Sequence, residues 1–259
     1  MCASPLGQKA LRAQVRAVRR GEAEGRVVVE GARLVAEAVA QGARLDLLVV
    51  SPRLRTRPIP AEALGSIEAH PAAQFLTDQE LERLSGGSSH QGTLAVVALP
   101  RWTPEDCLTG AGWLVVLDGV QDAANLGGIA RAALAFGAAG IWYRRGGARP
   151  DNPRAYRAAA GAFLRLPIAA VDDLDAALAA LEWPVWVASA HGEAMDGAWP
   201  PAGRAALVLG SEGQGSSVGI GRTVSIPMRE GSESLNVAQA AAVLLWRVRS
   251  ALQADSDLV

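Results

Sequence analysis

The stretch "WLVVLDGVQDAANLGGIARAALAFG", residues 113–137, decides the fold class. Its first part is a short apolar run, the pattern of a strand buried on both faces of a parallel sheet. A turn with acidic residues follows, and a helix is expected to begin near Asn125, because asparagine is a good N-cap. In that helix Arg131 lies about 200° around the axis from the apolar Ile129. The stretch therefore predicts a strand, a turn and a helix of an α/β domain, with Arg131 turned away from the core.

Strand and helix patterns continue from this stretch to the end of the chain. Strands are predicted for "GIWYRR", "LPIAAV", "PVWVASA", "AALVLGS" and "TVSIP", and a helix is predicted for "DDLDAALAALE". The last helix, expected over residues 234–252, carries a broad apolar stripe that includes Ala241, Leu244 and Val248. We therefore expect a parallel-sheet α/β domain over residues 113–259.

The first hundred residues contain a second, smaller set of alternating elements. Strands are predicted for "RVVVEG", "RLDLLVVS", "AQFLT" and "TLAVVALP", and helices for "ARLVAEAVAQG" and "DQELERLS". Residues 1–100 are therefore expected to form a small α/β domain. Residues 101–112 are rich in Pro, Gly and polar residues, which predicts a linker.

Basic residues gather near the amino-terminal end of the sequence. Residues 1–57 carry 11 basic and 5 acidic residues, although the whole chain has a net charge of −1. An amphipathic helix is expected over residues 7–20, with one apolar stripe and a neighbouring arginine stripe that can face a polyanion. The candidate residues for contact with the phosphates of such a polyanion are Arg12, Arg16, Arg19 and Arg20. The base composition of the coding sequence also explains part of this arginine richness.

Several classes of protein do not fit the composition. No run of about 18 apolar residues indicates a membrane span, and the basic start lacks the apolar core of a secretory signal. Two cysteines cannot build a disulfide framework. His70, His90 and His191 are too far apart in sequence to give a metal-ligand spacing. A cytoplasmic, metal-free protein that spans no membrane is expected.

Two further stretches place polar residues beside elements that look buried. In "LVLGSEGQGSS", residues 207–217, a strand enters a glycine-rich turn around Glu212, at the sheet edge where ligands of open α/β sheets bind. In "SESLNVAQAAAVLLW", residues 232–246, a helix opens with Ser232, Glu233, Ser234 and Asn236. A helix cap needs only one or two such residues, so this stretch has more than a cap requires.

In this order the three stretches resemble the three motifs of the SpoU/TrmH family of RNA ribose 2′-O-methyltransferases, over about residues 113–252. The segment "NPRAYRAAAGAFLRLPI" is similar to the family's stretch between its first two motifs, and residues 1–100 resemble the ribosomal-protein-like substrate-binding domain found in many members. The resemblance implies a deep trefoil knot in the second domain, a homodimer and S-adenosylmethionine as cofactor. The expected substrate is RNA, with 23S rRNA favoured and tRNA as the alternative.

The resemblance also implies which residues form the site. Arg131 is expected to act on the ribose hydroxyl, and because arginine holds its proton strongly, we expect it to stabilise developing alkoxide charge rather than to act as a base. The other expected catalytic residues are Asn125, Glu212, Ser234 and Asn236. The residues expected to cradle the cofactor are Leu209, Gly210, Ile226, Met228 and Leu235.

Two positions depart from the family pattern. Ala123 follows Asp122 where the family usually has proline, and Ala238-Gln239 stand where it usually has Ser-Val. These departures leave open an inactive homologue that still binds RNA. A nucleotide-dependent oxidoreductase that uses "NLGG" as its cofactor turn is a second alternative. It requires an acidic residue about 20 positions further on, where the nearest one is Asp151 and the glycine spacing differs.

Overall fold

The computed structural model describes residues 7–86, 91–195, 199–200 and 203–256. The chain divides into two compact units, Met1–Pro100 with Asp151–Leu164, and Arg101–Pro150 with Arg165–Val259. Residues 1–6 and 257–259, the ends of the two expected domains, lie outside the described residues. Each helix in the described part of the chain is too short or too polar to cross a membrane. The predicted α/β class is confirmed.

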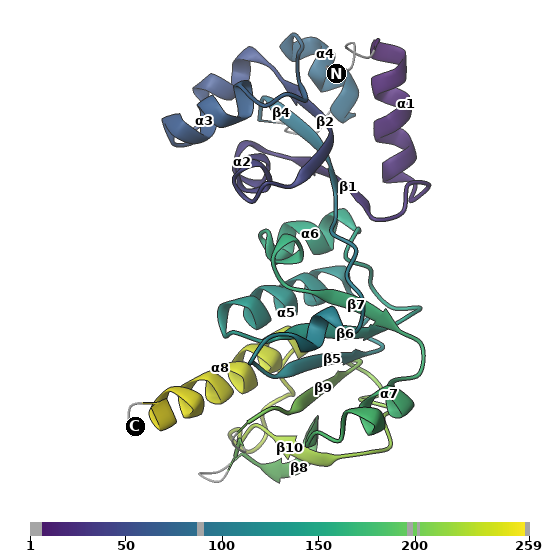
Figure 1. Cartoon of the computed structure of the whole chain (residues 1–259), viewed down its shortest axis with the longest axis vertical. Coiled ribbons are helices and arrows are strands. Elements are labelled where there is room, and N and C mark those ends of the chain that lie inside the picture. Colours follow the sequence, from purple (N-terminus) through teal and green to yellow (C-terminus); the bar gives the residue numbers. More distant parts are fainter. Residues whose placement is uncertain (1–6, 87–90, 196–198, 201–202, 257–259) are drawn as a thin grey trace. The chain divides into compact units, whose positions relative to one another are not determined.

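The first unit is built on a four-stranded sheet with the order β1-β4-β2-β3. β4 pairs antiparallel with β1 and β2, and β2 pairs parallel with β3. Helices α1 and α4 cover one face of the sheet, and α2 and α3 lie on the other (Figure 1). The strands are β1 (Arg26–Glu30), β2 (Arg44–Val50), β3 (Ala73–Phe75) and β4 (Thr93–Ala98), and the helices are α1 (Gln8–Arg19), α2 (Ala32–Ala40), α3 (Ala61–Glu68), α4 (Asp78–Ser85) and α6 (Pro153–Ala159).

Helix α1 packs as its amphipathic pattern predicts. Leu11, Val15 and Val18 are buried against β-sheet residues such as Leu47 and Val96. Two helices of this unit, α3 and α6, were not among the expected elements. Ile67 is the only fully buried residue of α3, so its apolar stripe is too thin to stand out in the sequence.

The second unit contains a six-stranded sheet with the order β10-β8-β9-β5-β6-β7. All five neighbouring pairs are parallel, which confirms the predicted parallel sheet. β8 extends beyond the expected segment and ends at Ala194. The strands are β5 (Leu114–Asp118), β6 (Gly140–Arg144), β7 (Ile168–Val171), β8 (Val185–Ala194), β9 (Ala206–Gly210) and β10 (Arg222–Ser225).

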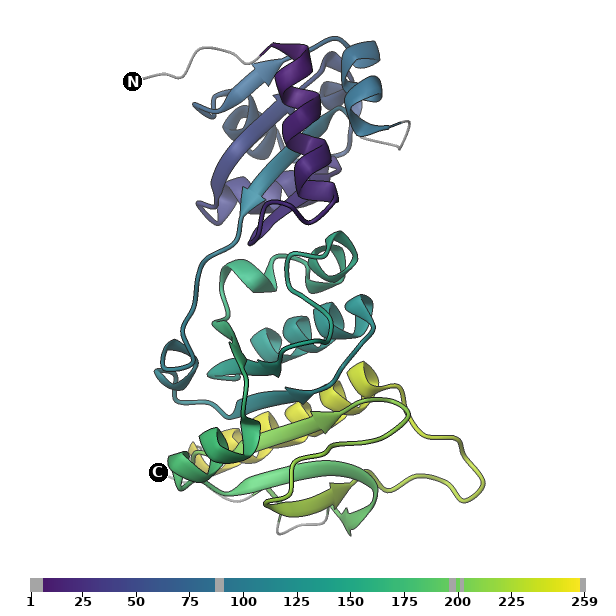
Figure 2. The same cartoon turned by 90° about the vertical axis from the view of Figure 1, so that its right-hand side faces the viewer.

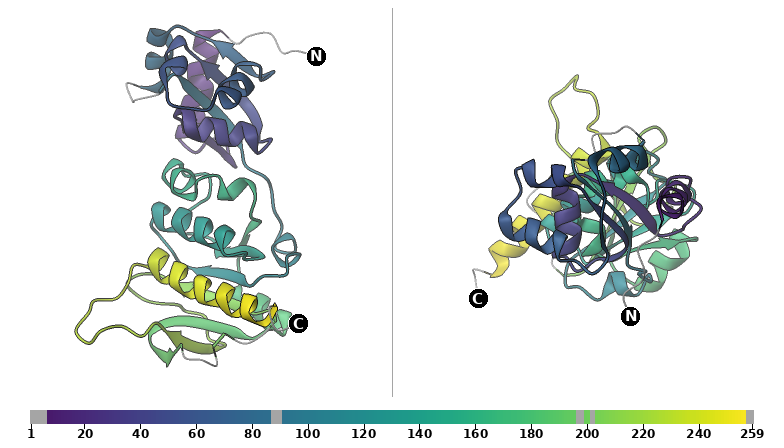
Figure 3. Two further views of the ribbon diagram at one scale, coloured as in Figure 1. Left: turned by 90° about the vertical axis from the view of Figure 1, so that its left-hand side faces the viewer. Right: turned by 90° about the horizontal axis from the view of Figure 1, so that it is seen from above.

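Helices cover both faces of this parallel sheet. α7 (Leu174–Leu181) packs on one face through Leu174 and Leu178, which belong to the same hydrophobic cluster as Leu114, Val116 and Val208 of the sheet. α5 (Ala123–Ala135) and α8 (Val237–Ser256) lie side by side on the other face, as Figures 1 and 3 show. A Cβ atom built on Gly128 lies 3.2 Å from the Cβ of Ala238, so glycine permits a close approach of the two helices here.

The strand order reverses between β5 and β9. From β5 the chain builds β6 and β7 on one side, and then returns to place β9, β8 and β10 on the other. In open α/β sheets, ligands bind outside the carboxyl ends of the strands at such a reversal. Asp118 ends β5 and lies opposite Gly210, which ends β9. The fold therefore points to the surroundings of these two residues as the site.

Three tryptophans close the opposite, amino-terminal edge of the sheet. Trp113 precedes β5 and is 1% exposed, and its Nε1 donates a hydrogen bond to the carbonyl of Gly203 at 3.1 Å. Trp199 meets Trp113 and Trp186 edge-to-face, with ring centroids 5.7 Å and 6.2 Å apart. These rings tie the start of β5 to β8 and to the segment that precedes β9.

Candidate functional site

The start of helix α5 differs from the expected one. The N-cap is Asp122, whose side chain accepts hydrogen bonds from the backbone N–H groups of Ala124 at 2.8 Å and Asn125 at 3.0 Å. The expectation that Asn125 opens the helix is therefore wrong, because the aspartate three residues earlier satisfies the first free N–H groups. The amide side chain of Asn125 is left available for other partners.

The glycine-rich turn after β9 forms a tight hairpin. Ser211 and Gly215 exchange two backbone hydrogen bonds, of 2.9 Å and 3.0 Å. A Cβ atom on Gly210 would overlap the backbone of Gly215 and Ser216, so this position requires glycine. Glu212 lies in the turn and is exposed. The hairpin thus presents one carboxylate at the carboxyl edge of the sheet.

Side chains from the three sequence motifs meet at this edge. The Nδ2 of Asn125 donates to the Oε1 of Glu212, and the Nδ2 of Asn236 donates to the Oδ1 of Asn125 at 3.0 Å. The Oδ1 of Asn236 accepts from the backbone N–H of Ala238 at 2.9 Å, which caps α8. α8 begins at Val237 rather than at the expected residue 234, and Asn236 is its cap. Asn125, Glu212 and Asn236 therefore form one hydrogen-bonded chain.

Arg131 and Ser234 are not part of this chain. Arg131 is exposed on α5, and it makes no hydrogen bond or ion pair with any residue that the structure describes. It lies six positions after Asn125 in the helix, a rise of about 9 Å. Ser234 is exposed in the segment between β10 and α8, which projects from the second unit as a loop in Figure 2. The guanidinium of Arg131 is thus free to contact a ligand.

The residues expected to hold the cofactor lie at the ends of β9 and β10 and in the loop that follows β10. Leu209 and Gly210 end β9, and Ile226 directly follows β10 and is half-buried. Met228 and Leu235 belong to the projecting loop, and they are 41% and 38% exposed. Large apolar side chains this exposed gain from contact with an apolar ring, so their chemistry fits the adenine of S-adenosylmethionine.

A buried carboxylate that the sequence interpretation missed lies beneath the hairpin. Asp118 is 4% exposed, and its Oδ1 accepts a hydrogen bond from the Nε of Arg144 at 2.6 Å. Its Oδ2 accepts from the hydroxyls of Ser216 and Ser217, both at 2.9 Å, and from the backbone N–H of Ser217 at 2.5 Å. The sequence does contain a signal for this residue, because Asp118 directly ends a strand whose other residues are all apolar.

The environment of Asp118 favours its ionised form. Burial alone raises the pKa of this carboxyl, but the hydrogen bonds from Arg144, Ser217 and Ser216 outweigh burial and hold the pKa below its ordinary value. A lowered pKa in the folded state adds stability above the unfolded-state pKa of about 3.9, and this stability is lost as pH falls through the folded-state value.

We expect the pH dependence of unfolding to reveal this carboxylate. Asp118→Asn should make the loss of unfolding free energy below about pH 4 shallower than in the unmodified protein, because no carboxyl is left to protonate. Urea unfolding between pH 3 and pH 7, followed by circular dichroism, measures the effect. The difference at pH 7 gives the full cost of the substitution, which includes the stability that the ionised carboxylate contributes there. Equal slopes below pH 4 would contradict the assignment.

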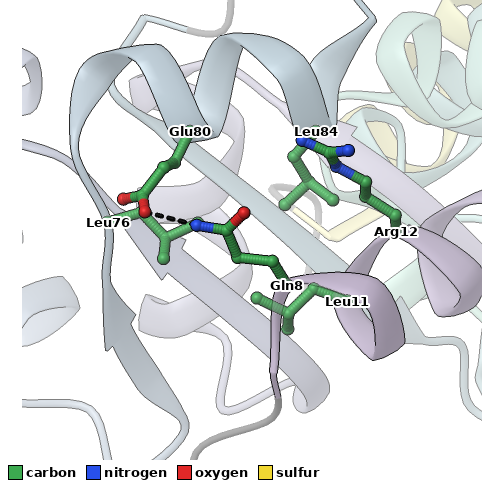
Figure 4. A pocket seen from close by; sticks show the side chains of 6 residues that line it. All are labelled: Gln8, Leu11, Arg12, Leu76, Glu80 and Leu84. Atoms are coloured by element: carbon green, nitrogen blue, oxygen red, sulfur yellow. Dashed lines mark hydrogen bonds between the residues drawn. The ribbon is translucent and has the colours of Figure 1, made fainter.

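The candidate RNA-binding arginines differ in their partners. Arg19 donates to Glu30 and, at 2.9 Å, to the carbonyl of Ser85, and Arg20 pairs with Glu22. Arg16 is exposed, and Arg12 lines a small pocket between α1 and α4 that Figure 4 shows. Neither Arg12 nor Arg16 has an ion pair within the described ranges. These two arginines therefore carry positive charge that no described carboxylate neutralises.

Two sequence models of known families match the chain. Residues 112–246 match the SpoU rRNA Methylase family, and residues 28–103 match the model described as RNA 2'-O ribose methyltransferase substrate binding. The protein named 23S rRNA (guanosine-2'-O-)-methyltransferase RlmB of Xylella fastidiosa (strain 9a5c) is 36% identical over 185 residues, which are 66% of this chain and 74% of that relative.

Solved structures share the fold over nearly the whole chain. A TrmH-family protein from Porphyromonas gingivalis gives a TM-score of 0.73 at 31% identity, and the match covers 96% of this chain and 100% of that one. The SpoU methyltransferase AviRb from Streptomyces viridochromogenes, solved with AdoMet, gives a TM-score of 0.76 at 23% identity, covering 93% and 97% of the two chains.

Proposed function

Because the chain belongs to the SpoU rRNA methylase family, and is thus an RNA 2′-O-methyltransferase that uses S-adenosylmethionine, we propose that it methylates the ribose of a guanosine in 23S rRNA. The observation that carries the proposal is the contact among Asn125, Glu212 and Asn236, since these residues come from three separate motifs and meet where the strand order reverses. The likeness to RlmB supports the rRNA target over the tRNA alternative.

A direct assay separates the two targets. Purified protein is incubated with tritiated S-adenosylmethionine and either a 23S rRNA transcript or total tRNA, and the modified position is mapped by mass spectrometry of nuclease fragments. We expect 2′-O-methylguanosine in the 23S transcript and none in tRNA. Methylation confined to tRNA, or its absence from both substrates, would overturn the proposed target.

The arrangement suggests how the side chains divide the work. Bound S-adenosylmethionine supplies a methyl group that is already activated for transfer. The guanidinium of Arg131 donates N–H groups to the ribose 2′ oxygen and stabilises the negative charge that develops on this oxygen during methyl transfer. The hydrogen-bonded side chains of Asn125, Glu212 and Asn236 orient the ribose relative to Arg131. Ser234, exposed in the loop between β10 and α8, contributes a hydroxyl that can hold a phosphate of the substrate.

We assign the cofactor to the ends of β9 and β10. The backbone at Leu209 and Gly210 and the side chain of Ile226 form one wall, and Met228 and Leu235 form the apolar wall of the projecting loop. This assignment explains why two large apolar side chains are left exposed in the protein alone. The trefoil knot belongs to the same proposal, because it brings the loop after β9 and the loop after β10 around one ligand.

A homodimer is part of the proposal. The inner face of α8 is buried through Ala241, Leu244 and Val248, yet the helix also presents Trp246, 56% exposed, on its outer face. A second copy of the chain that covers Trp246 removes this apolar surface from water. Sedimentation equilibrium should give about twice the chain mass, and a monomer at micromolar concentration would contradict the dimer. The working compartment is the cytoplasm, where rRNA is available.

We assign residues 1–100 to RNA binding, 101–112 to a linker and 113–259 to methyl transfer. In the first of these, Arg12 and Arg16 are the leading candidates for phosphate contacts, and Arg19 and Arg20 contribute less because intrachain partners hold them. The contacts are independent of base sequence, so their loss should weaken binding to all RNAs in a similar way.

Replacing Arg12 and Arg16 together by alanine tests this assignment. The slope of the log binding constant against log salt concentration should become less steep by about 1.5 to 2. The variant loses two phosphate contacts, so its binding to RNA releases fewer counterions. Filter binding of a 23S fragment at several salt concentrations measures it. Arg44→Ala, which removes an exposed arginine already paired with Asp46, is the matched control. An unchanged slope in the double variant would place the phosphate contacts elsewhere.

A further inference from the structure

The hairpin that carries Glu212 is held to the sheet at both of its ends. Its first residue, Gly210, pairs with Asp118 in the β9–β5 ladder. Its last residues return to the same place, because Ser216 and Ser217 donate three hydrogen bonds to the carboxylate of Asp118. One residue at the end of β5 therefore anchors both ends of the turn, through its backbone pairing at one end and its side chain at the other.

Arg144 completes this anchor from the neighbouring strand. It ends β6, its Nε donates to Asp118 at 2.6 Å, and its Nη2 donates to the hydroxyl of Ser217 at 3.3 Å. A buried carboxylate needs a partner charge and several hydrogen bonds, and here the charge comes from Arg144 of β6 and the other hydrogen bonds come from Ser216 and Ser217 of the hairpin itself. The arrangement leaves the turn little freedom to tilt relative to β5 and β9.

The third attachment of the hairpin is its contact with the hydrogen-bonded chain of Asn125, Glu212 and Asn236. Glu212 lies between the two anchored ends, and it accepts a hydrogen bond from Asn125. Asp118 does not reach this chain itself, since the described contacts of its carboxylate all go to Arg144, Ser216 and Ser217. Its influence on the site must therefore pass through the position of the hairpin.

We propose that Asp118 is a positioning residue, which holds the hairpin of residues 210–217 in the geometry that S-adenosylmethionine binding and the Glu212–Asn125 contact require. The inference rests on the proposed function for its cofactor, and extends the site to Asp118, Arg144, Ser216 and Ser217. Sites of this kind depend on supporting groups that lock the residues in contact with the ligand.

Two variants test the proposal with different risks. Asp118→Asn keeps the shape of the side chain but leaves Arg144 without its charge partner, which can destabilise the whole unit. The double variant Ser216→Ala with Ser217→Ala keeps the buried Asp118–Arg144 ion pair. It removes the two hydroxyls that donate to Asp118, and with them the bonds that they accept from Arg144 and from the backbone N–H of Val218. Glu193→Gln, which alters an exposed ion pair with Arg222 in the same unit, is the control.

The readouts separate positioning from stability. Hydrogen exchange of the peptide that contains residues 211–218 should become about tenfold faster in both variants, since a weakened anchor lets the hairpin open more often and expose backbone N–H groups such as that of residue 217. The Kd for S-adenosylmethionine, measured by calorimetry, should rise about tenfold, which corresponds to about 1.4 kcal/mol. The KM for the cofactor should rise more than kcat falls. The Glu193→Gln control should match the unmodified protein in all three measurements.

Two results would overturn the proposal. Exchange and Kd values like those of the unmodified protein in the double serine variant would show that the hairpin does not depend on this anchor. Faster exchange with an unchanged Kd would show that Asp118 has a structural role only. Failure of the unmodified protein to methylate 23S rRNA would count against the proposed target instead, because exchange and cofactor binding are read without RNA.

Discussion

Replacing Arg131 by alanine should lower the methylation rate by about a hundredfold to a thousandfold, the usual cost of removing one donor that stabilises charge in a transition state. The structure leaves the guanidinium exposed on α5, with no partner among the residues described. Its loss should therefore disturb neither the fold nor the cofactor, and the Kd for S-adenosylmethionine should stay near that of the unmodified protein. Single-turnover methylation and calorimetry give the two quantities.

The controls for Arg131 separate charge from chemistry. Arg131→Lys keeps a cation and should recover part of the lost rate if the residue stabilises negative charge, although a single ammonium cannot reproduce the planar fork of arginine. Arg204→Ala removes an exposed arginine at the opposite edge of the sheet, next to Trp183, and should leave the rate unchanged. A rate close to normal in Arg131→Ala would remove this residue from the mechanism.

Trp113→Ala should have the largest effect on stability, a loss of about 3–5 kcal/mol in the free energy of unfolding of the second unit. The ring is 1% exposed, and its removal leaves a cavity next to Trp199 as well as an unpaired carbonyl at Gly203. The neighbouring rings are themselves fixed by packing, so they can fill little of the space. Urea unfolding followed by far-ultraviolet circular dichroism measures the change.

Two further variants serve as comparisons, one a conservative substitution of Trp113 and one a substitution of an exposed residue. Trp113→Phe keeps an aromatic ring but loses the N–H that Gly203 accepts, so its cost should lie between zero and that of the alanine variant. Phe75→Ala removes a side chain that is 64% exposed and should change the unfolding free energy by no more than about 0.5 kcal/mol. An unchanged midpoint for Trp113→Ala would mean that the tryptophan cluster does not stabilise the sheet.

The sequence predicted the elements whose patterns are strong. Continuous apolar runs marked β5 and β9, and the stripe of Leu11, Val15 and Val18 marked α1. Helix α3 is not predicted because it buries only one residue fully. The sequence favours Asn125 as the start of α5, although Asp122 is an equally good capping residue three positions earlier. Local patterns cannot choose between such caps, since the choice depends on what the second side chain meets across the fold.

The site divides in a similar way. The meeting of Asn125, Glu212 and Asn236 followed from the family resemblance, not from spacing, because more than 80 residues separate Asn125 from Glu212. The family resemblance did not imply a role for Asp118. Its role depends on a hairpin that returns to β5 from 98 residues further along the chain. Local sequence patterns cannot predict a contact between residues so far apart in the chain.

The close approach of Gly128 and Ala238 limits which substitutions these two positions can accept. Each helix leads directly into a member of the hydrogen-bonded chain, since Asn125 lies one turn before Gly128 and Asn236 lies two residues before Ala238. A bulkier residue at either position would push the helices apart at the end where their amides touch. Positions 128 and 238 therefore act as a coupled pair, in which mutational effects are not additive. The departure from the family pattern at Ala238 has to be judged together with its glycine partner.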